Sequence, residues 1–158
     1  MSNARATFDV VRSYLQEKGW KFFASEESGA FELTVTGRTS VLHVRVQVGY
    51  DPLLVSVAVG LPTIVPEERR AQVAEAVVRM NYGLLVGCFD FDMRDGTLGF
   101  RAALPVVDAS ATPEQFGAVY RSALATADRY HRAFCRLLYG DDLSPAEAVA
   151  EVEMAPAK

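Results

Sequence analysis

The first third of the chain changes from a helical to a strand-like spacing of apolar residues. Between residues 7 and 18, Phe8, Val11, Tyr14 and Leu15 recur at steps of three and four, which predicts an amphipathic helix. Gly19 follows and predicts the helix end. Apolar and polar residues then alternate, which predicts four strands, at residues 20–24, 31–35, 42–48 and 53–59.

The next part of the chain predicts a second helix followed by two more strands. After a predicted linker at residues 61–65, a helix is expected from Pro66 to about Asn81, with Val73, Val77 and Met80 as its core stripe. Two alternating runs, at residues 86–92 and 97–104, are joined across Asp95-Gly96, a strong hairpin signal.

The long helix carries the clearest local signal. Thr112-Pro113-Glu114-Gln115 is a capping box with proline at the first helical position, and an apolar stripe continues from there to about Gly140. A second capping box begins at Ser144, but few apolar residues follow it. We therefore expect one α+β domain over residues 1–140 and an acidic, alanine-rich tail with a marginal helix over residues 141–158.

The predicted element order is α-β-β-β-β-α-β-β-α. It corresponds to a single antiparallel sheet of five to six strands with helices packed on one face. A chain of 158 residues is long enough to bury such a core without disulfides or metal. Cys88 and Cys135 stand far apart in the sequence and are expected to be buried thiols.

Charge and hydropathy narrow the classes of partner. The net charge of −4 disfavours nucleic acid and anionic membrane surfaces as partners. No apolar run approaches the length of a membrane span or a signal peptide, so a cytoplasmic protein is expected.

The candidates for chemistry are weak. Asp90, Asp92 and Asp95 lie close together, but Arg94 interrupts the alternation of oxygen ligands that a calcium loop needs. His43 is expected on a strand surface and His131 at the edge of the core, neither with a nucleophile signature nearby. We therefore expect no catalytic residue, metal or cofactor, and a protein that is not an enzyme.

A resemblance adds to this interpretation. Its residues are Asn81 at the end of the middle helix, the segment Gly87-Cys88-Phe89-Asp90, and residues 95–105 with their Leu104-Pro105 ending. With this element order, the chain resembles the YbjN family of bacterial sensory-transduction regulators, whose fold is like that of the type III secretion chaperones. The resemblance implies regulation or chaperone-like binding, commonly as a homodimer. The alanine-rich tail departs from it.

We therefore expect a non-enzymatic cytoplasmic regulatory or chaperone-like protein that binds a polypeptide partner. The polar face of the sheet is either open to water or used for this contact. The candidate partner-binding residues on that face are Phe23, His43, Arg45, Leu54 and Ala58. A homodimer is expected through a second apolar set on the middle helix, Ala71, Ala74 and Val78.

The alternative is a sensor of a small-molecule or lipid-like ligand. Its pocket would lie between the sheet and the helices, lined by Phe89, Phe100, Phe116 and Tyr120. Aromatic residues in such positions more often belong to a plain core.

Overall fold

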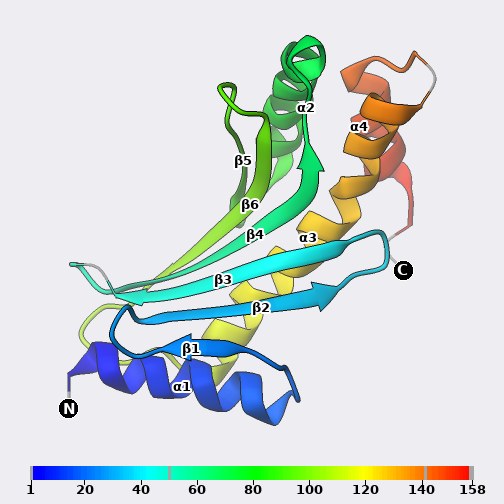
Figure 1. Ribbon diagram of the computed structural model, residues 1–158. Coiled ribbons are helices and arrows are strands. Elements are labelled where there is room, and N and C mark those ends of the chain that lie inside the picture. The colour runs from blue at the N-terminus through cyan, green and yellow to red at the C-terminus, as the bar shows by residue number, and fades with distance from the viewer. Residues whose placement is uncertain (1, 50, 141, 157–158) are drawn as a thin grey trace.

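The computed structural model describes residues 2–49, 51–140 and 142–156. Among these residues, the chain forms one helix, four strands, a second helix, two more strands and two final helices (Figure 1). The first elements are α1 (Asn3–Glu17), β1 (Phe23–Ser25), β2 (Ala30–Thr36), β3 (Val41–Gly49) and β4 (Leu54–Ile64). They are followed by a 3-10 turn, η1 (Glu67–Arg69), and by α2 (Arg70–Gly83), β5 (Cys88–Phe91), β6 (Thr97–Pro105), α3 (Pro113–Tyr139) and α4 (Pro145–Met154).

The six strands form one antiparallel sheet in the order β1-β2-β3-β4-β6-β5. Alternate residues of β2, β3, β4 and β6 are buried, and the residues between them point to the opposite face. One face of the sheet is therefore apolar and covered, while the other is polar and open. This arrangement confirms the predicted α+β class with a single antiparallel sheet and helices on one face.

Helices α1 and α3 cover the apolar face. The ring centroids of Phe8 in α1 and Phe31 in β2 are 4.4 Å apart, and Tyr14 meets the Phe116 ring of α3 edge-on at 5.2 Å. In Figure 1, α3 crosses behind the strands, and it packs against β4 and β6. The open face of the sheet is thus turned away from both helices.

The capping box of α3 is present as predicted. The Gln115 N–H donates to the Thr112 hydroxyl at 3.2 Å, and the Thr112 N–H donates to the Gln115 side chain at 3.0 Å. The helix ends at Tyr139, with Gly140 as its C-cap.

Three predicted boundaries in the first half were wrong. Helix α1 begins at Asn3, four residues before the predicted start, because the Ser2 hydroxyl accepts the Arg5 N–H and caps a first turn without buried apolar residues. Strand β1 is shorter than predicted, covering only Phe23–Ser25. Residues 61–64 of the segment predicted as a linker belong to β4, which runs to Ile64.

Pro62 explains the error in β4. Proline removes a backbone donor and is usually excluded from central strands. Here the pairing of β3 with β4 stops at Gly60, and the register with β6 shifts between Gly60 and Ile64. The missing N–H of Pro62 therefore lies beyond the regular ladder.

The second helix also starts later than predicted. Pro66 precedes the 3-10 turn, and α2 itself begins at Arg70. Its predicted core stripe of Val73, Val77 and Met80 is buried, together with Ala76. The predicted buried thiols need correction as well, because Cys88 and Cys135 are both only half-buried.

Helix α4 packs against α2 and α3. Its N-terminus has the predicted capping box, in which the Glu147 N–H donates to the Ser144 hydroxyl at 3.2 Å. Its residues Ala148, Val149 and Val152 are buried in the common core. Residues 141, 157 and 158 of the predicted tail lie outside the described residues. The division into a domain over residues 1–140 and a tail with a marginal helix over residues 141–158 stays a prediction. No helix among the described residues is long and apolar enough to cross a membrane.

Candidate functional site

The open face of the sheet carries all five predicted partner-binding residues, and the strand register brings three of them into one row. Phe23 of β1 pairs with Glu32 of β2, Glu32 with Arg45 of β3, and Arg45 with Ala58 of β4. The row continues from Ala58 to Arg101 of β6. Phe23 is 71% exposed, which leaves its ring in water at the end of the row.

The other two predicted residues lie in different rows. His43 is exposed on β3 and pairs with Gly60 of β4, one same-face step from Arg45. Leu54 is half-buried at the start of β4, where it pairs with Gly49 and Pro105. Leu54 lies four residue steps from Ala58 along the strand, a distance of about 13 Å. The five predicted residues therefore share a face but do not form one compact cluster.

The residues of β4 on the open side of the sheet are small from Ser56 to Gly60. Ser56, Ala58 and Gly60 follow one another on the open side of the strand. Arg45 on one neighbouring strand donates to the Glu32 carboxylate at 2.7 Å, and Arg101 on the other donates to the Asp90 carboxylate at 3.2 Å. Both acceptors lie on the strand beyond, so each arginine is held away from Ala58. We call the line of Ser56, Ala58 and Gly60 between Arg45 and Arg101 the β4 trough.

A second exposed surface lies on α2, opposite the core stripe. The predicted dimer residues Ala71 and Val78 are exposed and Ala74 is half-buried. Tyr82 continues this stripe in the last turn of the helix, and Leu85 follows two residues past the helix end, after an extended residue at Leu84. The exposed fractions are 70% for Val78, 95% for Tyr82 and 100% for Leu85, so three large apolar side chains lie in water. We call Ala71, Ala74, Val78, Tyr82 and Leu85 the α2 stripe.

A hollow of about 590 Å³ runs beside the α2 stripe, between α2 and α4. Val78 and Tyr82 line it from α2, and Ala146, Val149 and Ala150 line it from α4. An ion pair between Glu75 and Arg79, at 2.7 Å, stands on its rim. The apolar surface of α2 is therefore bordered by an apolar groove.

Sequence reasoning missed Tyr82 and Leu85 as parts of this surface. Both continue the spacing of three and four residues that marks Ala71, Ala74 and Val78. The helix was expected to end at about Asn81, so residues beyond it were not considered part of its apolar set. The continued spacing of three and four residues was the sequence signal that could have identified them.

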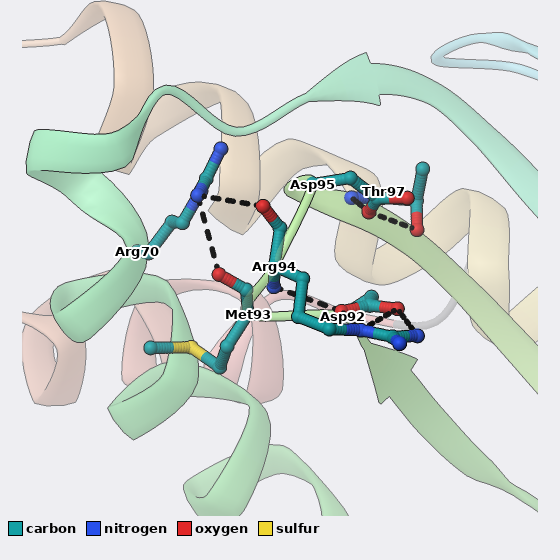
Figure 2. A network of polar contacts seen from close by, with 6 residues as sticks. All are labelled: Arg70, Asp92, Met93, Arg94, Asp95 and Thr97. Atoms are coloured by element: carbon teal, nitrogen blue, oxygen red, sulfur yellow. Dashed lines mark hydrogen bonds and ion pairs between the residues drawn. The ribbon is translucent and has the colours of Figure 1, made fainter.

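Asp90, Asp92 and Asp95, near the hairpin of β5 and β6, each contact a different partner. Asp92 accepts hydrogen bonds from Arg94, and Asp95 accepts the N–H and the hydroxyl of Thr97, both at 2.8 Å (Figure 2). The third, Asp90, faces Arg101 on the open side of the sheet. The hydrogen bonds from Arg94 lower the pKa of Asp92 to about 2, so its carboxylate stays charged. Among the described residues, no three His, Cys, Asp or Glu side chains form a group that could hold a metal ion.

Arg70 ties this hairpin loop to α2. Its guanidinium donates to the carbonyl oxygens of Met93 at 3.2 Å and Arg94 at 3.1 Å (Figure 2). Its Nε donates to the Val65 carbonyl at 3.3 Å. The loop is thus held as a structural connection between β4, α2 and the hairpin.

His131 lies inside the fold rather than at its edge. Its Nδ1 is 3.4 Å from the Thr39 hydroxyl, its Nε2 is 3.4 Å from the Thr63 hydroxyl, and the Cys135 Sγ lies 3.6 Å from Nε2. Burial lowers the pKa of His131, which the charge of Asp128 partly opposes, and burial raises the pKa of the Cys135 thiol. A nucleophilic cysteine needs a lowered pKa, so this pair lacks the activation that such catalysis requires.

Two of three comparisons with known proteins found a match. The family model YbjN, described as "Putative bacterial sensory transduction regulator", matches residues 7–136. A crystal structure described as "YbjN, a putative transcription regulator from E. coli" is similar at 20% identity, with a TM-score of 0.53, covering 77% of this chain and 85% of that one. No curated protein matched the sequence.

A weaker structural likeness is to a chain in the "HopA1-SchA Chaperone-Effector Complex". The identity is 11% and the TM-score 0.47, covering 73% of this chain and 84% of that one.

The family match extends from α1 to the last turn of α3 and includes Asn81 and the hairpin of β5 and β6. The chain therefore belongs to the YbjN family of bacterial sensory transduction regulators.

Proposed function

We propose that this protein is a cytoplasmic, non-enzymatic regulator that acts by holding a polypeptide partner on the open face of its sheet. Membership of a regulator family supports the regulatory part. The observation that carries the binding part is the β4 trough, where small residues lie between two arginines that are held apart. A segment of a partner chain can approach the strands closely only where side chains are this small.

The chemistry of the open face suits a polypeptide better than a lipid or nucleic acid. Its charges occur as pairs of opposite sign, Arg45 with Glu32 and Arg101 with Asp90. Nucleic acid would require a surplus of cations, and the chain carries a net charge of −4. A mixture of small apolar residues and polar borders is typical of transient protein interfaces.

Photocrosslinking from single positions tests this proposal. A photoreactive phenylalanine analogue in place of Phe23, the exposed aromatic residue at the end of the row that contains Ala58, should yield one discrete adduct in cells, identified by mass spectrometry and then reconstituted from purified components. The matched control carries the same analogue at Gln16, an exposed position of α1. Adducts of equal yield and identity from both positions, or an adduct that fails to form with the purified partner, would refute the open face as the binding surface.

The ligand-sensor alternative loses its predicted location. The Phe89, Phe100, Phe116 and Tyr120 side chains are all buried. Phe89 contacts the Phe100 ring with centroids 5.0 Å apart, and the Phe116 and Tyr120 rings lie 5.5 Å apart. These four rings pack within the core, so a ligand bound at this position would have to displace them.

We further propose that the protein is a homodimer joined through the α2 stripe. The stripe is symmetric in sequence about Val78, since Ala74 and Tyr82 lie four residues on either side and Ala71 and Leu85 lie seven. In an antiparallel pairing on a two-fold axis at Val78, Ala74 of one copy faces Tyr82 of the other, both within the helix. Such pairing would cover the exposed Tyr82 and Leu85 side chains, which a monomer leaves in water.

Light scattering and cysteine pairing test the dimer. A mass near 17.3 kDa at micromolar concentration would end the proposal. If the mass is doubled, Ala74→Arg and Val78→Glu should each give folded monomers. In a chain whose two native cysteines are replaced by serine, Val78→Cys should form a disulfide with its own copy. Ala74→Cys should pair with Tyr82→Cys rather than with itself, and self-pairing of Ala74→Cys would place the axis elsewhere.

A further inference from the structure

The largest hollow described lies outside both surfaces discussed above. It has a volume of about 840 Å³ and is bounded by α3, the turn between β2 and β3, the end of α2 and the end of α4. Its apolar walls include Leu84, Ala125, Val152 and Ala155. Arg38, Arg129 and Arg132 also line it, with Asp128 as the one carboxylate. A hollow of this size can accept a small organic molecule.

One wall of this hollow is fixed by Asp128. Its carboxylate accepts the backbone N–H of Arg38 at 2.8 Å and that of Thr39 at 3.0 Å. These hydrogen bonds lower the pKa of Asp128 against the effect of its burial. Gly37 permits the contact, because a Cβ there would lie 2.2 Å from a carboxylate oxygen of Asp128. The turn that carries Arg38 is therefore held in place before any ligand arrives.

The opposite wall is fixed by the next residue of α3. Arg129 Nη2 donates to the carbonyl oxygens of Val152 at 3.0 Å and Glu153 at 3.3 Å, and reaches that of Ala155 at 3.4 Å. The Tyr130 hydroxyl donates to the Glu153 carboxylate at 3.0 Å. These contacts satisfy carbonyl groups at the end of α4, which lack partners within the helix. The hollow is thus preformed on both sides, which lowers the cost of binding.

The charge of the lining is positive although the whole chain is negative. Three arginines and one aspartate line the hollow, and the Asp128 carboxylate already accepts backbone hydrogen bonds. Within residues 2–49, 51–140 and 142–156, Arg132 has no hydrogen-bond or ion-pair partner. A guanidinium group presents several donors to an acidic group, and apolar walls beside it favour a hydrocarbon part.

We propose that this hollow binds a small organic anion, whose acid group lies against Arg132 and whose apolar part lies against the Leu84, Ala125 and Val152 side chains. The acid can be a carboxylate or a phosphate, since both accept hydrogen bonds from arginine. Such a site would allow a sensory regulator to bind a small organic anion. It lies away from the β4 trough and the α2 stripe and rests on neither proposal.

Titration with octanoate, followed by NMR of the backbone amides, tests the proposal. A ligand of this size should bind with a Kd of about 1 mM and shift the amides of Leu84, Ala125 and Ala155. Arg132→Gln should weaken binding about tenfold, because it removes a charged hydrogen bond. The matched control is Arg69→Gln, which removes the same charge outside the lining and should leave the affinity unchanged.

Two further ligands separate the contribution of the acid group from that of the hydrocarbon tail. Octyl phosphate should bind at the same amides, and its affinity relative to octanoate identifies the preferred acid. The neutral 1-octanol should bind about tenfold more weakly than octanoate. Equal binding of octanol and octanoate, equal effects of the two arginine variants, or shifts confined to other amides would each overturn the proposal.

Discussion

Asn81 joins α2 to the edge strand β5 through both polar groups of its side chain. Its Oδ1 accepts the Phe89 N–H at 2.7 Å, and its Nδ2 donates to the Phe89 carbonyl at 3.1 Å. Phe89 lies on the outermost strand, so its outward backbone groups have no further strand to pair with. The amide of Asn81 takes the place of that strand.

The effect of Asn81→Leu follows from these two contacts. Each hydrogen bond contributes about 1 kcal/mol, and partial access of water limits the added cost of leaving the Phe89 groups unpaired. We therefore expect the free energy of unfolding to fall by about 2 kcal/mol, and the melting temperature by about 4–8 °C. Urea unfolding followed by circular dichroism measures the change, and Gln72→Leu on the exposed side of α2 is the control.

Asn81→Asp gives this prediction a pH signature. The introduced carboxyl can accept the Phe89 N–H when charged, but only its protonated form can also donate to the Phe89 carbonyl. Folding should therefore raise its pKa above the ordinary value, so the variant recovers stability relative to wild type as the pH falls from 7 towards about 4. Equal stability of Asn81→Leu and wild type, or an Asn81→Asp variant that tracks wild type across this range, would refute the role of the amide.

Other predictions concern stability. Because burial lowers the pKa of His131, the unfolded chain binds a proton at this residue more readily than the folded chain. The free energy of unfolding should therefore fall as the pH drops below 6.5, by at most about 1.4 kcal/mol per pH unit. His131→Leu should reduce this pH dependence in urea unfolding, and an unchanged slope would contradict the prediction. Gly96→Ala should cost about 3 kcal/mol, since Gly96 has a φ of +80° and a Cβ would lie 2.1 Å from the Val65 carbonyl. Gly19→Ala, with a similar φ and open space, should cost only about 1 kcal/mol, and equal costs by calorimetry would refute the steric argument. Residues 1–140 alone should fold, but their melting temperature should be several degrees below that of the full chain. The truncation removes the buried Val149 and Val152 side chains, which together contribute about 3 kcal/mol. An unchanged melting temperature would contradict the packing of α4.

Local patterns in the sequence were enough to predict most elements. The capping box at Thr112 and the stripe behind it predicted α3, and the Asp95-Gly96 pair predicted the last hairpin. Both signals act within a few residues and do not depend on distant contacts. Pro62 misled the prediction of β4, because whether a proline disrupts a strand depends on the neighbouring strand.

The sites required knowledge of long-range contacts. Alternation placed Phe23, Arg45 and Ala58 on one face, but only the strand register put them in one row. The contacts of Asp128 with the turn at residues 38–39 join segments 89 and 90 residues apart. No periodicity in the sequence indicates such a pair, so the preformed hollow beside α3 could not be predicted.

The affinity of the purified partner for variants of the β4 trough tests the central claim most directly. Calorimetry should give a Kd for the wild type that rises at least tenfold, about 1.4 kcal/mol, in Ala58→Glu, because a buried unpaired carboxylate would meet the partner. Gln16→Glu introduces the same charge at an exposed position of α1 and should leave the Kd unchanged. Equal Kd values for wild type and Ala58→Glu, with both proteins folded, would contradict binding on the open face of the sheet.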